Sequence, residues 1–323
     1  MTRICIYGAG AIGGHLAANL ARAGDTDISV VVRGRALDAI RSRGLTIETS
    51  EGAFNTQVAA TDDAASLGPQ DYVILTLKAP AVAAAVPGIA TLVGQDTTIV
   101  TAMNGIPYWY FYKHGGAWDG HQLSCADPGA HQWESLGAER AIGAVVWTAA
   151  AVTAPGIVRH TFGNRFDLGE PDGSTSPRAA KLSDILTGAG LQAPIAANIR
   201  STIWNKLWGN LSFNPVSALT LTVLDAMAQS PRTTSVLRAM MIEALCIGEK
   251  LGVAFPMNVD ERIALAKNVG AHKTSMLQDL EAARPLEIDA LTGVIAELGR
   301  LVGVATPTVD AVLALAHQRA RNT

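Results

Sequence analysis

The sequence predicts an α/β protein that combines an amino-terminal doubly wound sheet with a carboxyl-terminal all-helical domain. Over the first hundred residues, short apolar runs alternate with Ala-rich stretches, which is the pattern of a parallel sheet with helices on its faces. A glycine-rich turn directly follows the first apolar run. From about Ile199 onward, helical periodicity continues almost to the end, interrupted only by prolines such as Pro215. We therefore expect one domain over residues 1–197 and a second over residues 198–323.

Composition narrows the class of partner. The 323 residues are 49% hydrophobic and 16% charged, with a net charge of −3, so the chain can bury a core in each of two domains. This balance offers no basic surface for nucleic acid or an anionic membrane, and no apolar run reaches the roughly 18 residues that span a bilayer. We expect a small-molecule partner, no nucleic acid and no membrane.

The cysteines bear on the compartment. Cys5, Cys125 and Cys246 are odd in number, far apart and without metal-ligand spacing. The first residues also lack the charged and apolar regions of a signal peptide. We therefore expect a cytoplasmic protein without a metal site.

The expected elements of the first domain follow from apolar runs and turn residues. Parallel strands are predicted at residues 3–7, 28–32, 72–77 and 98–103, helices at 11–23, 36–43 and 80–92, and a small hairpin at 45–48 and 54–59. Strands at 142–153, 156–161 and 165–168, with turns at Ala154-Pro155-Gly156 and Gly163-Asn164, are expected to extend the sheet with antiparallel character.

An insertion is predicted at about residues 106–140, because the aromatic, Gly-rich and His-rich stretch 108–138 has no clear period. Two interpretations remain open for it. The segment lines a substrate pocket, or it is a surface loop or interface patch that packs its own aromatic rings.

The glycine-rich turn has the sequence Gly8-Ala9-Gly10-Ala11-Ile12-Gly13, between a strand and an Ala-rich helix. In a Rossmann-type dinucleotide site the first glycine allows the tight turn, the second lets the backbone approach a pyrophosphate, and the third lets helix and strand pack closely. The amides at the helix start then hold the phosphates. The alternative is a turn that merely packs well.

The residue after the second predicted strand indicates which dinucleotide is bound. NAD sites place Asp or Glu there for the ribose hydroxyls, whereas this chain has Arg33. A guanidinium can bind a ribose phosphate through two hydrogen bonds, so we predict NADP(H) as the cofactor, with Arg35 assisting. Asp38 is the nearest acid and lies too far along the next helix to replace the missing one. The alternative is that Arg33 is an ordinary surface residue.

Two further residues follow predicted strands. Lys78 and Asn104 come after the strands at 72–77 and 98–103, at the sheet edge where ligands of parallel sheets bind. Both could face the nicotinamide half of the cofactor. Equally open is that Lys78 is solvated and that Asn104-Gly105 is only a turn dipeptide.

A polar stripe marks the first helix of the second domain. Lys206, Asn210 and Asn214 recur every fourth residue and so share one helix face, flanked by Trp204, Leu207, Leu211 and Phe213. Asn is a poor residue for a helix interior, and an exposed face would more often mix Glu with Lys. A lone Lys is usually solvated, but this register favours a functional cleft.

Taken together, these motifs resemble the ketopantoate reductase (2-dehydropantoate 2-reductase) family. The resemblance rests on the glycine loop, Arg33, Leu75-Thr76-Leu77-Lys78-Ala79, Asn104-Gly105, the Lys206/Asn210/Asn214 stripe and the block from Ser275-Met276-Leu277-Gln278-Asp279 to Glu287-Ile288-Asp289. It covers nearly the whole chain, with the motifs in the right order.

The resemblance implies a function and an active site between two domains. The implied reaction is the NADPH-dependent reduction of a 2-oxo acid to a 2-hydroxy acid, here 2-dehydropantoate to pantoate in pantothenate biosynthesis. Lys206 would be the general acid and Glu287 a second catalytic or binding carboxylate. The substrate-binding residues would be Asn210, Asn214, Ser275 and Asn104, and the cofactor-binding residues Gly8, Ala9, Gly10, Ala11, Ile12, Gly13, Arg33, Lys78 and Asn104.

The chemistry agrees with these residue types. Hydride addition to a ketone leaves an alkoxide, which a positioned ammonium group attracts and protonates. Burial would lower the pKa of Lys206 unless Glu287 pairs with it. Two simpler readings stay open: Glu287 is an exposed acid in the first turn of a helix, and Ser275 is a helix cap ahead of Leu277.

Other functions remain as alternatives. A related oxo-acid or β-hydroxyacid dehydrogenase would use the same cofactor geometry on a different substrate. A non-catalytic NADP(H)-binding sensor would keep the glycine loop without the chemistry. Apolar stripes on the last helices suit a core or a homodimer contact equally well.

Overall fold

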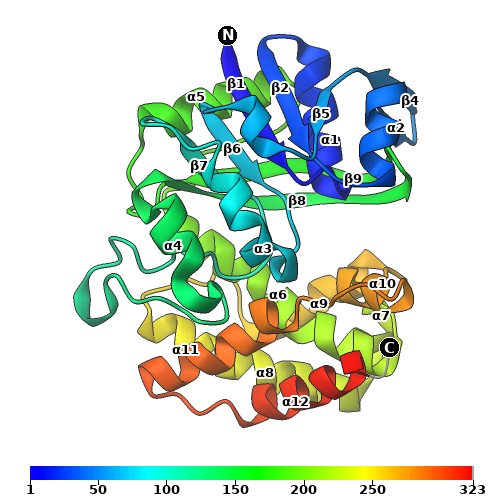
Figure 1. The fold of residues 1–323 in the computed structure, drawn as a ribbon. Coiled ribbons are helices and arrows are strands. Elements are labelled where there is room, and N and C mark those ends of the chain that lie inside the picture. Colours follow the sequence, from blue (N-terminus) through cyan, green and yellow to red (C-terminus); the bar gives the residue numbers. More distant parts are fainter. Residues whose placement is uncertain (322–323) are drawn as a thin grey trace. The chain divides into compact units, whose positions relative to one another are not determined.

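The computed structural model describes residues 1–321, which form two compact units (Figure 1). The first unit comprises Met1–Met103, Pro107–Gln122 and Ala130–Ile199. The second comprises Asn104–Ile106, Leu123–Gly129 and the chain from Arg200 onward. Two short segments within the predicted first domain therefore pack with the helical unit.

A mixed sheet is the frame of the first unit. Within residues 1–321 it has nine strands in the order β4-β3-β9-β8-β7-β6-β1-β2-β5. Their bounds are β1 Thr2–Tyr7, β2 Thr26–Val31, β3 Leu45–Thr49, β4 Gly52–Thr56, β5 Ala59–Thr61, β6 Tyr72–Leu75, β7 Thr98–Thr101, β8 Ala141–Ala154 and β9 Ile157–Gly169. The strands from β8 through β7, β6, β1 and β2 to β5 pair in parallel, which confirms the doubly wound prediction.

Helices connect these parallel strands. Their bounds are α1 Ala11–Ala23, α2 Arg35–Arg43, α3 Ala79–Ala90, α4 His131–Leu136 and α5 Pro177–Gly188, with 3₁₀ turns η1 Ala64–Leu67, η2 Gly116–Trp118, η3 Pro128–Ala130 and η4 Ala138–Arg140. The chain steps from β1 to β2 in one direction across the sheet and from β6 to β7 in the other. Right-handed crossovers therefore place α1 and α3 on opposite faces.

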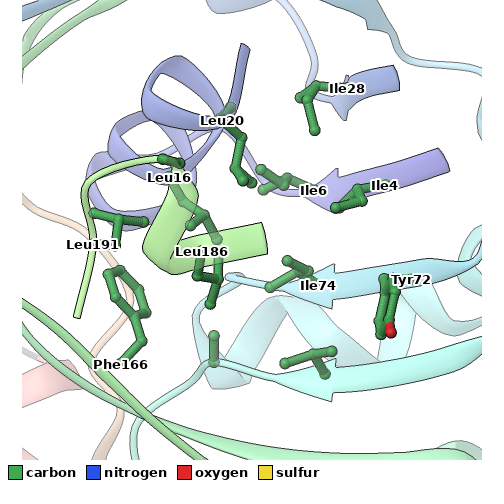
Figure 2. Close-up of a cluster of buried hydrophobic side chains, with 14 of the residues drawn as sticks. Ile4, Ile6, Leu16, Leu20, Ile28, Tyr72, Ile74, Phe166, Leu186 and Leu191 are labelled. Atoms are coloured by element: carbon green, nitrogen blue, oxygen red, sulfur yellow. The ribbon is translucent and has the colours of Figure 1, made fainter. Parts of the chain in front are cut away.

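The main core lies between the sheet and the pair α1 and α5 (Figure 2). Ile4 and Ile6 of β1 face it, together with Leu16 of α1 and Leu186 of α5. Cys5 is also buried but points to the other side, because successive side chains of a strand alternate between faces. Such burial on both faces explains why the parallel strands are continuous apolar runs.

The long hairpin of β8 and β9 extends the sheet as an antiparallel pair, as predicted. The predicted turn at Gly163-Asn164 is wrong, because β9 runs through it without a break. A register shift places these two residues opposite the single residue Thr148, which is a β-bulge. Gly163 has φ +68°, so the dipeptide supplies the unusual backbone that a bulge and a turn both need.

The predicted small hairpin is confirmed as the antiparallel pair β3 and β4. Its predicted end is wrong, because Ala59 begins β5, which pairs in parallel with β2. β3 also pairs in parallel with β9, so the hairpin forms one end of the main sheet.

The aromatic segment after β7 contributes core residues to the first unit. Tyr108, Trp109, Tyr110 and Phe111 are each at most 3% exposed. Trp109 donates a hydrogen bond from Nε1 to Thr101 Oγ1 at 2.9 Å, and Tyr110 and Phe111 meet edge to face. This burial supports packing of the segment's own rings, but these four residues lie in the core and not on a surface loop.

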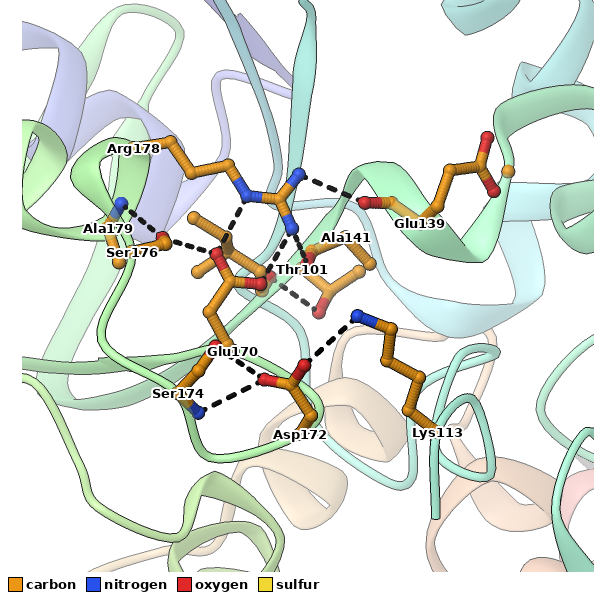
Figure 3. A network of polar contacts seen from close by, with 12 residues as sticks. Thr101, Lys113, Glu139, Ala141, Glu170, Asp172, Ser174, Ser176, Arg178 and Ala179 are labelled. Carbon is orange, nitrogen blue, oxygen red and sulfur yellow. Dashed lines mark hydrogen bonds and ion pairs between the residues drawn. The ribbon is translucent and has the colours of Figure 1, made fainter. Parts of the chain in front are cut away.

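An ion pair between the buried Glu170 and the partly exposed Arg178 joins the end of β9 to the start of α5 (Figure 3). Arg178 donates from Nε and Nη2 to the two carboxylate oxygens of Glu170, at 2.7 and 2.6 Å. Arg178 also donates to the carbonyl oxygens of Glu139 and Ala141. These bonds compensate the buried carboxylate of Glu170, so the network holds the sheet and α5 together.

The second unit is helical, as predicted. Its elements are α6 Ile199–Thr220, α7 Leu224–Gln229, α8 Pro231–Lys250, α9 Val259–Val269, α10 Ser275–Glu281, the π-helix η5 Asp289–Gly293, α11 Val294–Val302 and α12 Pro307–Arg321. Trp208 of α6 is buried and donates from Nε1 to the carbonyl oxygen of Met241 in α8, at 2.8 Å. None of the helices within residues 1–321 has the length and apolarity of a membrane span.

The predicted interruption at Pro215 is wrong, because α6 continues through it to Thr220. Proline has no N–H, so the carbonyl oxygen of Leu211 loses its usual helical donor. Thr292 of η5 supplies a replacement by donating from Oγ1 to that oxygen, at 3.5 Å. The proline thus creates a contact between α6 and the π-helix.

Candidate functional site

The glycine loop in the first unit has the backbone of a dinucleotide site. Gly8 has φ +108°, which favours glycine. A Cβ at Gly13 would overlap the carbonyl oxygen of Gly8 and Thr76 Oγ1, whereas a Cβ at Gly10 would meet nothing within 4 Å. The loop is therefore closed on the side of the sheet and open at Gly10, where a ligand can approach the backbone.

The start of α1 offers amide donors at this opening. The first helical hydrogen bond runs from Gly14 N to Gly10 O, at 2.8 Å, and no side chain caps the helix. The amides of Ala11, Ile12 and Gly13 make no hydrogen bond to a described residue, and the first turn holds no acidic side chain. These donors and the helix dipole suit the phosphates of a dinucleotide.

Arg33 lies two residues after β2 and is exposed, and Arg35 is the first residue of α2. Neither guanidinium forms an ion pair within the described part of the chain. Asp38 lies in the first turn of α2, as expected. Arg33 thus remains available to an anionic ligand, and its recognition of a ribose phosphate stays a prediction.

Lys78 and Asn104 belong to different units. β6 and β7 end at Leu75 and Thr101, two residues before the predicted ends, so neither side chain directly follows a strand. Lys78 is exposed and occupies the N-cap position of α3 in the first unit. Asn104 belongs to the second unit, where the adjacent Gly105 (φ +94°) lies against the backbone of Ala290 in η5.

Lys206 lies on α6 with Asn210 and Asn214, while the flanking apolar residues of the stripe are buried. Burial lowers the pKa of Lys206 to about 8, and the negative charge of Glu287 opposes this shift. Glu287 is only 6% exposed and directly precedes the turn that leads into η5. The reading of Glu287 as an exposed helix acid is therefore wrong.

Asn214 and Ser275 meet at a second point of the same unit. Asn214 is 5% exposed and donates from Nδ2 to Ser275 Oγ, at 3.5 Å. Ser275 is not the cap of α10, because Thr274 holds that position and accepts a hydrogen bond from Leu277 N. Ser275 is an exposed residue, so a ligand can reach it.

Besides Asn104, the second unit carries five of the predicted residues on three segments. α6 carries Lys206, Asn210 and Asn214, the start of α10 carries Ser275, and the turn before η5 carries Glu287. The hydrogen bond from Thr292 to Leu211 fixes the π-helix against α6. π-helical turns of this kind are frequent at functional sites.

Sequence reasoning missed two residues, one in each unit. Thr76 donates from Oγ1 to the carbonyl oxygen of Gly8, at 2.6 Å, and so supports the glycine loop. Arg262 of α9 packs on Gly209 of α6. The position of Thr76 at the end of a predicted strand was a usable signal, whereas nothing in the sequence marks Arg262.

Two protein families match the chain. Residues 4–173 match the family described as ketopantoate reductase PanE/ApbA, and residues 198–320 match its C-terminal family. A 2-dehydropantoate 2-reductase of Mesorhizobium japonicum is 52% identical over 318 residues, which cover 98% of each chain.

Solved structures agree with the sequence matches. A crystal structure from Ralstonia solanacearum MolK2, named for ketopantoate reductase, superposes with a TM-score of 0.95 at 42% identity, covering 100% of this chain and 98% of that one. A 2-dehydropantoate 2-reductase from Geobacter metallireducens gives a TM-score of 0.86 at 28% identity, with coverages of 98% and 99%. The chain belongs to the ketopantoate reductase family.

Proposed function

We propose that this oxidoreductase reduces 2-dehydropantoate to pantoate with NADPH. The observation that carries the proposal is Lys206, a desolvated lysine whose pKa of about 8 is held up by the carboxylate of Glu287. A general acid works best with a pKa near the operating pH. The 52% identity to a 2-dehydropantoate 2-reductase supports the choice of substrate.

The glycine loop would hold the cofactor. The crowding at Gly13, the open space at Gly10 and the amides of Ala11 to Gly13 fit a dinucleotide pyrophosphate. Arg33 would bind the ribose phosphate, and Lys78 of the same unit would also contact the cofactor. NADPH, when bound, supplies the hydride.

The helical unit would bind and protonate the substrate. Lys206 donates a proton to the carbonyl oxygen as it becomes an alkoxide, and Glu287 keeps the ammonium form populated. Asn210, Asn214, Ser275 and Asn104 would orient the substrate through hydrogen bonds. Because Asn214 already donates to Ser275, the two would act as one polar unit.

The Lys206→Ala variant tests the proposal. Removing the ammonium should lower kcat for NADPH oxidation with 2-dehydropantoate at least tenfold, about 1.4 kcal/mol of transition-state stabilisation, while NADPH binding stays intact. Lys273→Ala is the matched control, because Lys273 is an exposed lysine paired with Glu281. Unchanged turnover would remove Lys206 from the mechanism.

A panel of 2-oxo acids tests the substrate assignment. If another oxo acid is reduced with a kcat/KM far above that of 2-dehydropantoate, the chain is a related dehydrogenase instead. NADPH binding without turnover of any oxo acid would point to a sensor.

A homodimer and a cytoplasmic location stay predictions. Ile242 of α8 and Leu315 of α12 are 45% and 58% exposed, which supports an apolar contact on these helices. Light scattering should give twice the 33.7 kDa of one chain if the dimer forms. The three cysteines are free, in accord with a reducing compartment.

A further inference from the structure

Arg262 is a guanidinium without a protein partner. It lies in the first half of α9, is half-buried, and forms no hydrogen bond or ion pair through its side chain with any residue from 1 to 321. Burial alone lowers its pKa. Arg178, by contrast, is matched by a carboxylate and two carbonyl oxygens. A desolvated cation costs free energy unless an anion compensates it.

Gly209 of α6 makes the room for this guanidinium. A Cβ at Gly209 would overlap Nη2 of Arg262 and lie 2.9 Å from its Cζ. Gly209 stands three residues after Lys206, and side chains at that spacing are neighbours on a helix, with Cβ atoms about 5–6 Å apart. The guanidinium therefore lies within about one helical turn of the Lys206 backbone position.

A second unmatched polar atom belongs to a residue one turn earlier on α6. The side-chain oxygen of Asn205 is buried and has no hydrogen-bond partner among the described residues. Asn205 is four residues before Gly209, so both positions share one side of α6. The same side of α6 thus carries the glycine that Arg262 packs on and a residue with an unmatched acceptor, and such groups suit a ligand with an anionic group and a hydroxyl.

We propose that Arg262 binds the carboxylate of the 2-oxo acid substrate. This inference rests on the proposed function, in which Lys206 is engaged at the carbonyl oxygen and Glu287 would repel an anion. The carboxylate of such a substrate is bonded directly to the carbonyl carbon, so its cation must lie close to Lys206. A guanidinium can donate two parallel N–H hydrogen bonds, one to each carboxylate oxygen.

The test compares a substrate that has the carboxylate with one that has only the reacting carbonyl group. Arg262→Met should raise KM for 2-dehydropantoate about ten- to a hundredfold, as expected for a lost charge-assisted hydrogen bond, with a smaller change in kcat. The lactone of 2-dehydropantoate carries no carboxylate, so its kcat/KM should change less than twofold. Arg262→Lys should recover part of the affinity, and Arg238→Met, which removes an exposed arginine of α8 paired with Asp260 of α9, should behave like the parent chain.

Gly209→Ala is a second route to the same result. The added methyl group displaces the guanidinium, so it should raise KM for 2-dehydropantoate. In an Arg262→Met background, the same substitution should raise KM little further. An unchanged KM in Arg262→Met, or equal losses for the acid and the lactone, would overturn the inference.

Calorimetry with pantoate distinguishes failure of the proposed function from failure of the carboxylate site. A parent chain that binds pantoate but reduces no 2-oxo acid would refute the proposed function, while loss of pantoate binding in Arg262→Met would still support the carboxylate site. Equal pantoate affinity in the parent chain and in Arg262→Met, or no binding by either, would refute the site.

Discussion

Neutralising Glu287 should move the pH profile of the enzyme toward acid. Burial lowers the pKa of Lys206 from 10.5 to about 8, and the charge of Glu287 limits that fall. Glu287→Gln keeps the size of the side chain and removes the charge. An opposite charge in close proximity shifts a pKa by about 1–3 units, so the pKa of Lys206 should fall to about 7 or below.

The size of the effect follows from the protonated fraction of Lys206. Reduction needs the ammonium form, so kcat declines as pH rises through the pKa of Lys206. At about pH 7.5, a lysine with a pKa of 8 is roughly three-quarters protonated, whereas one with a pKa of about 7, 6 or 5 is roughly one-quarter, 3% or 0.3% protonated. We therefore expect a loss in kcat of at least about threefold, rising to about 240-fold for the largest shift. The reverse oxidation needs the neutral amine, so its rate should rise with pH through the same pKa.

The assay is kcat against pH at saturating NADPH and 2-dehydropantoate, with NADPH affinity measured separately by fluorescence. Glu281→Gln serves as the control, because Glu281 is exposed and pairs with Lys273. Its profile should coincide with that of the parent chain. A coincident profile for Glu287→Gln would refute the electrostatic role of Glu287.

Three further predictions test the cofactor site, the first core and the helical unit. Arg33→Ala should weaken NADPH binding at least tenfold more than NADH binding, and equal weakening would show that Arg33 does not recognise the phosphate. Burial and the nearby His160 lower the pKa of His15 from 6.5 to about 4. As pH falls, the unfolded chain therefore binds a proton before the folded chain does. The free energy of unfolding should decrease by up to about 3 kcal/mol between pH 6.5 and about pH 4. His15→Phe should flatten that slope in chemical denaturation at several pH values. Thr292→Val should destabilise the chain by about 1 kcal/mol, and by less in a Pro215→Ala background, where residue 215 again carries the N–H that pairs with the carbonyl of Leu211.

Local pattern predicted much of the fold. Residue spacing over a few positions was enough to predict the glycine loop, the alternation of strands and helices, and the helical second unit. The ends of strands were predicted less well. Thr76, for example, is a β-branched residue that suits a strand, but it lies just beyond β6 and donates a hydrogen bond to the carbonyl oxygen of Gly8. The Gly163-Asn164 dipeptide suits a bulge and a turn alike, and only pairing with a distant strand decides between them.

The helical unit shows where sequence reasoning ends. The Lys206, Asn210 and Asn214 register was visible because all three lie on one helix. The approach of Glu287 to Lys206 links positions 81 residues apart, and no local signal predicts it. Arg262 looks like an ordinary solvated arginine in the sequence, because neither its burial nor the space above Gly209 is a property of its neighbours in the chain.

The two units are interleaved along the polypeptide. The chain passes between them five times, because Asn104–Ile106 and Leu123–Gly129 belong with the helices although first-unit sequence flanks them. Glu297 of α11 accepts hydrogen bonds from the backbone amides of Ser124 and Cys125, at 2.7 and 2.8 Å. A fragment that begins at Arg200 would leave this carboxylate without its donors and Ala290 without Gly105. A chimera that joins this helical unit to a relative's nucleotide-binding unit therefore needs three pieces of this sequence. A chimera made at a single splice point would lose the contacts that Glu297 and Ala290 make with the two short segments.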